Sequence, residues 1–437
     1  MPKIIQSFLS RDFWSTILPV LAILFGTAWL AYQFIQPAPP RKVVMTSGAE
    51  GGAYESFATE FRDILARDGI EVELRPSAGS VDNLNRLKDE ASGVSIGFVQ
   101  GGIAKSEDST NLMSLASLYY EPLWVFYRNG PEVDRIRSFR GKRLAIGSEG
   151  SGTRALSLQV LKLAGLDETN TTFLALGATA AADALIKGDI DAAIVIGSPE
   201  SPVVHKFMHA RSVQLMNFSH AEAYTRHLPF LSHVVLPKGG IDLVDDIPAR
   251  DVHLVAPTAN LVVRDDIHPA LVSLLMQAAT EIHGDAGMLQ KAGEFPSSKY
   301  LDIPQSLDAH RYIKDGPPFL QRHLPFWMAV LFDRLVVMLI PILAVLIPMF
   351  KLAPAVYAWR IKSRIYRWYG KLKVLEVDME TAEKAADIKA LQERLNVIEQ
   401  SVTRIPTPLA YSDYLYNLRS HIDLVRAKLL KRQESAT

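Results

Sequence analysis

A long uncharged segment near the start of the chain constrains the fold more than any other feature. From Phe13 to Ile35 no residue is charged and most are apolar, a run long enough to cross the hydrocarbon core of a membrane, about 30 Å thick. A secretory signal peptide is the alternative, but its apolar region normally spans about 7–15 residues and ends at a small-residue cleavage site. The proline-rich residues 36–40 offer only a weak site of that kind. Residues 13–35 therefore predict an uncleaved transmembrane anchor that follows a cytoplasmic N-terminus at residues 1–12.

A second apolar segment, residues 325–350, predicts another membrane-spanning helix, although a buried core helix is the alternative. Leu335 to Phe350 is entirely apolar, and the prolines within it are better tolerated in membrane helices than in soluble ones. Residues 351–375 then form a juxtamembrane segment with basic and aromatic residues and no acidic ones. By the positive-inside rule this end of the helix is cytoplasmic, so both termini are expected inside and residues 40–323 outside.

The composition excludes several classes of protein. The 437 residues include 47 basic and 47 acidic side chains, so no excess of positive charge favours nucleic acid as a partner. Cysteine is absent, which excludes disulfides, thiolate zinc sites and cysteine nucleophiles. Apolar residues make up 48% of the chain, enough to bury a large core in two or three structural units.

The external region alternates strand-like runs with helical ones. Val43–Ser47 and Ala192–Gly197 have the pattern of strands, whereas Tyr54–Ala66 and Ala155–Ala164 have the spacing of amphipathic helices. This order predicts an α/β fold with parallel sheets. A region of about 280 residues lies at the upper limit for one domain, so two lobes are expected.

The lobes are expected to be discontinuous in sequence. The β-rich segments Trp124–Arg128 and Ser232–Pro237 are candidates for crossing between them. Lobe one would then comprise residues 43–122 and 236–315, and lobe two residues 124–230. Two crossings of this kind form the hinge of bilobed periplasmic binding proteins.

Three expected strand-to-helix loops, at residues 47–54, 77–83 and 147–154, are rich in glycine, serine and threonine. Each opens a helix whose first backbone N–H groups have no partner within the helix, and the helix dipole favours an anion there. Loops beyond the carboxyl ends of strands line the ligand crevice of α/β proteins, so the three loops predict one anion cleft. Ordinary helix capping is the alternative for each loop. Arg154 is either a charge-assisted partner for a carboxylate or an exposed first-turn residue.

No catalytic motif is complete. Gly150–Ala155 fits the dinucleotide pattern G-x-G-x-x-A, but the acidic residue expected about 20 positions later is absent. The same loop lacks the lysine of a P-loop, and no serine lies in a G-x-S-x-G elbow. His205 and His209 have the spacing of metal ligands without the glutamate of H-E-x-x-H. The chain is therefore expected not to be an enzyme, and neither a cofactor nor a metal is expected.

Several motifs together resemble the TAXI-type solute-binding proteins, which serve TRAP transporters. They are Ser47-Gly-x-x-Gly-Gly-x-Tyr54, Gly79-Ser-Val-x-Asn83-Leu, Gly97-Phe-Val-Gln100 and Gly150-Ser-Gly-Thr153. The resemblance spans about residues 43–315. It implies a bilobed type II periplasmic-binding-protein (Venus flytrap) fold. Together with the two predicted spans, it leads us to expect a two-pass protein of the bacterial cytoplasmic membrane. It also implies a small organic anion as ligand, such as glutamate, 2-oxoglutarate or a related dicarboxylate, and TRAP-type permease subunits as partners.

Carried over by position, the resemblance implies a ligand shell drawn from the same loops. These residues are Gly52, Tyr54, Ser80, Asn83, Gln100, Ser151, Gly152 and Thr153. Gly51, Ser148 and Arg154, from the first and third loops, are further candidates for ligand binding. The first loop departs from the family pattern at Glu50, which is an unfavourable neighbour for an anion.

The cytoplasmic tail, residues 376–437, carries two heptad patterns separated by Ile405-Pro-Thr-Pro408. The first comprises Ile388, Leu391, Leu395, Ile398, Val402 and Ile405, and the second comprises Leu415, Leu418, Ile422, Val425 and Leu429. They predict an antiparallel helical hairpin whose role is self-packing or homo-oligomerisation, or else docking to a transporter subunit or signalling partner. The chain is thus expected to be a membrane-tethered solute-binding protein. A transmembrane ligand sensor that signals through the hairpin is the alternative.

Overall fold

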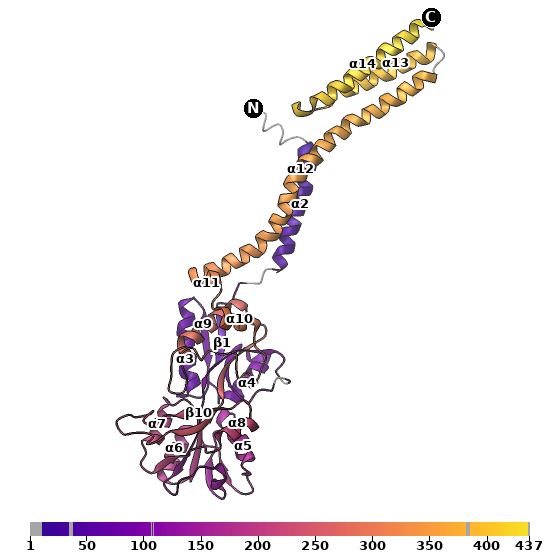
Figure 1. Ribbon diagram of the computed structural model, residues 1–437. Coiled ribbons are helices and arrows are strands. Elements are labelled where there is room, and N and C mark those ends of the chain that lie inside the picture. Colours follow the sequence, from indigo (N-terminus) through magenta and orange to yellow (C-terminus); the bar gives the residue numbers. More distant parts are fainter. Residues whose placement is uncertain (1–10, 35–37, 106, 108, 382–384, 436–437) are drawn as a thin grey trace. The chain divides into compact units, whose positions relative to one another are not determined.

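The computed structural model describes residues 11–34, 38–105, 107, 109–381 and 385–435. The chain divides into two compact units (Figure 1). One, the α/β unit, is Pro37–Leu331, and the other, the helical unit, joins Met1–Gln36 to Phe332–Thr437. Every strand in the described part of the chain belongs to the α/β unit.

The first sheet of the α/β unit has the strand order β2-β1-β3-β12-β4. Strand β1 pairs in parallel with β2 and β3, whereas β12 runs antiparallel to both β3 and β4. All five residues of β3 are buried, as expected for a strand covered on both faces. The strands are β1 (Lys42–Thr46), β2 (Glu71–Arg75), β3 (Ile96–Gln100), β4 (Leu112–Tyr120) and β12 (Thr258–Arg264).

The second sheet has the order β10-β11-β5-β8-β6-β7, with β9 paired to β5 outside this path. Strand β6 is parallel to β7 and β8, and β5 is antiparallel to β8. The strands are β5 (Leu123–Arg128), β6 (Arg143–Ala145), β7 (Thr172–Leu174), β8 (Ala192–Ile196), β9 (Val213–Leu215), β10 (Ser232–Leu236) and β11 (Val252–Ala256).

The chain passes between the two sheets twice, at Glu121-Pro122 and at Pro257. The second crossing lies about twenty residues later than the sequence predicted. Strand β10 pairs with β11 along its whole length and β11 pairs with β5, so residues 236–256 belong to the second sheet and not to lobe one. The first crossing precedes β5, which is itself a central strand of that sheet. The two crossing segments are bonded to each other, because the Glu121 backbone N–H donates to the Pro257 carbonyl at 2.9 Å.

Helices cover both sheets, and most of them bury one apolar face, although α11 has no buried residue. Helix α3, for example, buries Tyr54, Ala58, Phe61, Ile64 and Leu65, which recur at helical spacing. The helices are α3 (Ala53–Arg67), α4 (Ser80–Lys88), α5 (Gly152–Leu163), α6 (Ala178–Lys187), α7 (Pro202–Met208), α8 (Ala221–His227), α9 (Pro269–His283), α10 (Leu307–Asp315) and α11 (Phe319–His323). Short 3-10 helices lie at Glu90–Ser92 and Ile136–Phe139.

Each sheet has its own hydrophobic core. Phe61 and Phe98 pack edge to face in the core of the first sheet. In the second core the rings of Phe126 and Phe207 stack with their centroids 4.3 Å apart. Truncation of an aromatic ring buried to this extent typically costs about 3–5 kcal/mol. The two lobes are therefore separately packed bodies joined by the two crossing segments.

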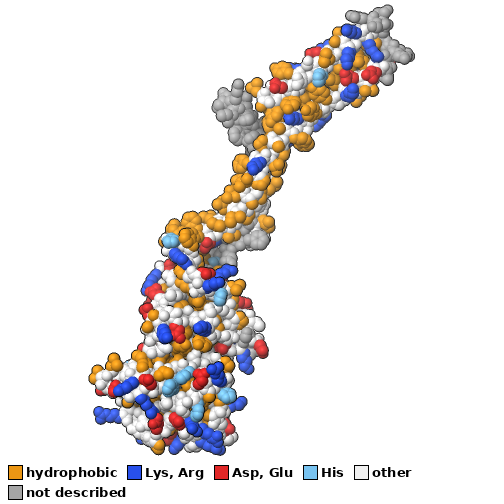
Figure 2. All heavy atoms as spheres, viewed as in Figure 1, with side chains coloured by type: hydrophobic (Ala, Val, Ile, Leu, Met, Phe, Trp, Pro, Cys, Tyr) orange, Lys and Arg blue, Asp and Glu red, His pale blue; other side chains and the backbone are white. Residues whose placement is uncertain are grey.

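The helical unit contains a long apolar helix, α12 (Phe326–Thr381), of which residues from Phe332 onward belong to this unit. Helix α12 is the one described helix whose length and composition suit a membrane span, and α2 (Arg11–Phe34) contributes only a shorter apolar stretch, Leu21–Leu30. Figure 2 shows hydrophobic side chains gathered on the exposed surface of α12. Of the two predicted spans, the structure thus supports one. Residue 35, the last of the predicted span at 13–35, lies outside the described residues. Residues 1–10 of the predicted N-terminus lie outside them too.

The tail contains the predicted hairpin of two helices, and a third helix packs against it to make a bundle. Helices α13 (Ala385–Thr403) and α14 (Ser412–Ser435), joined through a short 3-10 helix at Leu409–Tyr411, form two of its members. The third is the end of α12, from which Ile361, Ile365, Leu372, Leu375 and Met379 are buried in the same core. The helix was not recognised as a member because its basic residues obscure the apolar spacing. Both heptad patterns face this core, so they pack within one chain.

Candidate functional site

The three predicted loops do open helices, and a fourth helix start joins them. The residues that precede the helices are Gly52 for α3, Gly79 for α4, Ser151 for α5 and Gly177 for α6. Helices α3 and α4 belong to lobe one, and α5 and α6 to lobe two. Helix α5 starts at Gly152, three residues earlier than predicted, because the Ser151 hydroxyl accepts a hydrogen bond from the Arg154 N–H and caps the helix.

All four helix starts line one cavity of about 450 Å³ between the lobes. The lining includes most of the predicted ligand residues, namely Gly51, Gly52, Tyr54, Ser80, Gln100, Ser151, Gly152 and Thr153. It also includes residues that the sequence did not single out, among them Glu121, Thr179, Gly197 and Ser201. None of the described residues that line the cavity is a lysine or arginine, so its polar groups are helix ends, hydroxyls, one amide and the carboxyls of Glu50 and Glu121.

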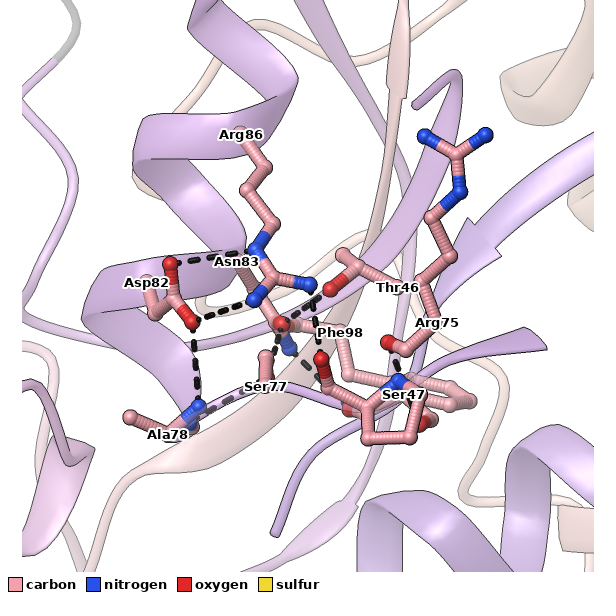
Figure 3. Close-up of polar contacts among 11 residues, drawn as sticks. Thr46, Ser47, Arg75, Ser77, Ala78, Asp82, Asn83, Arg86 and Phe98 are labelled. Atoms are coloured by element: carbon pink, nitrogen blue, oxygen red, sulfur yellow. Dashed lines mark hydrogen bonds and ion pairs between the residues drawn. The ribbon is translucent and has the colours of Figure 1, made fainter. Parts of the chain in front are cut away.

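Asn83 lies outside this lining and instead joins the ends of three strands (Figure 3). Its Oδ1 accepts hydrogen bonds from the hydroxyls of Thr46 and Ser77, both at 2.6 Å. Its Nδ2 donates to the carbonyls of Ser47 at 3.1 Å and Phe98 at 2.9 Å. These four bonds use the whole capacity of a carboxamide. Asn83 therefore holds the first two loops in place and has no group left for a ligand.

Ser148 and Arg154 also lie outside the lining. The Ser148 carbonyl accepts a hydrogen bond from the Ser151 hydroxyl at 2.6 Å, which closes the third loop. The Arg154 side chain does not reach the cavity, although its backbone N–H completes the Ser151 cap. Both residues thus shape the loop that presents Ser151, Gly152 and Thr153.

Gln100 is the polar side chain at the floor of the cavity. Its residue is 2% exposed, and its Nε2 has no hydrogen-bond partner among the described residues. Its backbone N–H donates to the Ser80 hydroxyl at 2.5 Å, which fixes the end of β3 against the start of α4. A buried amide donor without a partner is costly, and Gln100 belongs to the cavity lining, so its amide is a candidate group for hydrogen bonding to a ligand.

The lobes approach each other closely beside the cavity, where α4 and α5 begin. The Asp82 backbone N–H donates a long hydrogen bond to the Gly150 carbonyl, with 3.4 Å between nitrogen and oxygen. A Cβ at Gly152 would lie 2.4 Å from Gln100 Oε1, and one at Gly150 would lie 3.1 Å from the Ala78 Cβ. Glycine at these two positions is therefore what lets lobe two rest against lobe one.

Glu121 is the functional candidate that the motifs missed. It is 4% exposed, and its carboxyl accepts hydrogen bonds from the hydroxyls of Tyr54 at 2.9 Å and Tyr119 at 3.4 Å. Burial raises the pKa of Glu121 to about 7, although both tyrosine hydroxyls act to lower it. The sequence did carry a signal, since Glu121 is the one charged residue in the apolar run from Leu112 to Tyr127.

Comparison with known proteins places the chain in a family. Residues 45–296 match the NMT1-like family, which is more than half of the chain. Solved structures that resemble it include an ancestral arginine-binding protein bound to arginine, with 12% identity over 56% of this chain and 94% of that one and a TM-score of 0.37. The alkanesulfonate-binding protein SsuA from Xanthomonas axonopodis pv. citri is 15% identical over 56% and 75%, with a TM-score of 0.37. The aliphatic sulphonate-binding protein SsuA from Escherichia coli is 12% identical over 64% and 84%, with a TM-score of 0.38.

The family match confirms the prediction of a solute-binding protein rather than an enzyme. The two lobes, the double crossing and the cavity between them are those of a type II periplasmic binding fold, here followed by C-terminal helices. This chain belongs to the NMT1-like family, the TAXI/NMT1 group of type II periplasmic binding proteins.

Proposed function

We propose that this protein captures a small organic anion outside the cytoplasm, such as glutamate, 2-oxoglutarate or a related dicarboxylate, and presents it to a TRAP-type permease. The observation that carries the proposal is the convergence of four helix starts from both lobes on one cavity. Their unpaired N–H groups and the positive ends of their dipoles favour a carboxylate without any cationic side chain.

The remaining groups of the cavity suit the same ligand class. Gln100 Nε2 is a buried donor in need of an acceptor, and Ser80 and Thr153 add hydroxyls to the lining. A cavity of about 450 Å³ falls within the range of about 300–1,000 Å³ that small-molecule sites occupy. In this proposal Gly51, Gly52, Tyr54, Ser80, Gln100, Ser151, Gly152 and Thr153 contact the ligand.

For the membrane topology we propose two passes, with α2 and the apolar part of α12 as the spans and the α/β unit outside. The basic residues 351–375 support a cytoplasmic C-terminal bundle by the positive-inside rule. Because the chain has no cysteine, single cysteines report topology against an empty background. A cysteine at Glu168 should react in intact cells with a membrane-impermeant maleimide, and one at Asp413 only after lysis. The reverse labelling would contradict this topology.

The ligand proposal is tested by thermal denaturation of the full chain in detergent with a panel of organic acids. A ligand at 100 times its Kd stabilises the folded state by about 2.7 kcal/mol, which raises Tm by several degrees. We expect such a shift with at least one carboxylate and none with alkyl sulfates of similar size. The absence of a shift with every acid in a broad panel would contradict the proposal.

A transmembrane sensor is the second candidate, and one observation favours it. The helix α12 contains Phe326 and Val330, buried in the core of lobe one, and also Ile361 and Leu375, buried in the bundle core. If ligand binding shifts α12, cysteines on the bundle surface should crosslink differently with and without ligand. Unchanged crosslinking at saturating ligand would leave transport as the sole function.

A further inference from the structure

The cavity holds one buried charge that a simple dicarboxylate leaves without a partner. Glu121 lines the cavity at the first crossing between the lobes, where its backbone is bonded to the second crossing at Pro257. Its side chain is fixed from two elements, since Tyr54 comes from the first turn of α3 and Tyr119 from the end of β4. The carboxyl therefore has a set position at the hinge.

The two tyrosines leave part of this carboxyl unused. One hydroxyl donates to each carboxylate oxygen, and each oxygen has a second lone pair for a further donor. Among the described residues that line the cavity, no lysine or arginine supplies that donor. A buried carboxylate with hydroxyl partners alone is poorly compensated, and the compensation it needs is a cation.

Resting on the ligand class proposed above, we propose that Glu121 is the specificity-determining residue for a ligand amino group. The ligand is then a zwitterion, an amino acid whose carboxylate meets the helix starts and whose ammonium meets Glu121. Keto acids and plain dicarboxylates of the same length fill the same space but place a carbonyl or methylene opposite the carboxyl. They lose one charge-assisted hydrogen bond, worth about 10- to 100-fold in affinity.

Few groups around Glu121 titrate with it. Tyr54 and Tyr119 have pKa values raised well above their ordinary range by burial, so both hydroxyls stay protonated. His283 of α9 stacks on the Tyr119 ring, and burial lowers its pKa to about 3, so it is neutral. The strand β8 contributes only Val195, Ile196 and the following Gly197 to this lining. An ammonium that arrives at Glu121 near pH 7 therefore displaces a proton from this carboxyl.

The test is calorimetric titration of the full chain with the matched pair L-glutamate and 2-oxoglutarate, and with L-aspartate and succinate. Wild type should prefer the amine-bearing member of at least one pair by about 10- to 100-fold. Glu121→Gln should abolish that preference while it retains binding of the amine-free member. Glu168→Gln changes an exposed carboxyl of lobe two that lies outside the lining, and it should keep the preference of wild type.

A second measurement needs no variant. Wild-type titrations at pH 7 in buffers of different ionisation enthalpy should show proton release with the amino acid and none with the keto acid. Equal affinity of wild type for both members of every pair, or a preference that survives Glu121→Gln, would overturn this inference and leave anion capture standing. Failure of wild type to bind any member of either pair would overturn the proposed ligand class itself, and this inference with it.

Discussion

Asn83 and Gln100 are both buried amides at the edge of the first sheet, and they differ in how their hydrogen-bonding groups are used. Asn83 makes four bonds to groups at the ends of β1, β2 and β3, so it is saturated. Gln100 leaves its buried Nε2 without a partner among the described residues, and Glu121, which lines the same cavity, has only hydroxyl partners. The saturated amide contributes to the stability of the fold, whereas the open groups lower stability until a ligand completes them.

The largest expected effect is the loss of stability on substitution of Asn83, the amide whose hydrogen-bonding groups are all used. Asn83→Ala removes four hydrogen bonds and leaves buried partners unpaired, so the free energy of unfolding should fall by about 3–5 kcal/mol. Chemical denaturation of the full chain measures it, with the exposed Asn85→Ala as the matched control. A loss below about 1 kcal/mol would mean that the loops do not depend on Asn83.

Substitution of Glu121 should raise the stability of the unliganded protein, whereas substitution of Asn83 lowers it. Its pKa rises from 4.5 to about 7 on folding, so the folded state binds the proton more tightly and is favoured at low pH. As pH rises from 4.5 through 7 this contribution is lost, at a cost of about 3 kcal/mol. Glu121→Gln removes the cost, so the unliganded variant should be more stable than wild type at pH 8 and converge with it near pH 4.5. Melting curves of both proteins between pH 4.5 and pH 8 measure this difference in stability. Equal pH dependence of the two proteins would contradict a raised pKa for Glu121.

A smaller effect is expected where the lobes meet. A methyl at Gly152 would lie 2.4 Å from Gln100 Oε1, so Gly152→Ala should hold the lobes apart and weaken ligand binding by about 10- to 100-fold. Gly177→Ala is the matched control, because a Cβ there meets nothing within 4 Å although the residue lines the same cavity. Titration calorimetry compares the two variants. Equal losses of affinity in both would show that lobe contact is not the cause.

The smallest effect is expected at Gln100. Gln100→Met keeps the length of the side chain and removes the unpartnered donor, so stability without ligand should change by less than about 1 kcal/mol. Ligand affinity should fall about tenfold, since one hydrogen bond to the ligand is lost. The same titrations and melts measure both quantities. A large loss of stability with unchanged affinity would reverse the roles of Gln100 and Asn83.

The sequence predicted local structure well and long-range structure less well. Val43–Ser47 was predicted as a strand and matches β1 to within one residue, and Tyr54–Ala66 falls within α3, because apolar period and glycine-rich boundaries act locally. The position of the second crossing depended on which strands β10 and β11 pair with, and pairing is not encoded in a local pattern. The third helix of the bundle was missed for another reason, because its basic residues obscure the apolar spacing of the face that is buried.

The candidate site shows a similar division. Helix starts were predictable because glycine and serine before an apolar run mark them, and eight of the eleven predicted residues line the cavity. The motif could not distinguish Asn83 from Ser80, which lies three positions earlier. The Asn83 side chain bonds to the strand ends and loops, whereas Ser80 lines the cavity. Glu121 belongs to no motif, and only its position at the crossing brings it to the site.

A structure of the full chain saturated with its most stabilising carboxylate would show directly whether the ligand binds at the four helix starts. We expect the carboxylate at the N–H groups that open α3, α4 and α5, with the Gln100 amide donating to the ligand. A ligand bound elsewhere, for instance in the separate cavity of lobe two lined by Phe207 and Pro248, with the space between the lobes unchanged, would contradict it.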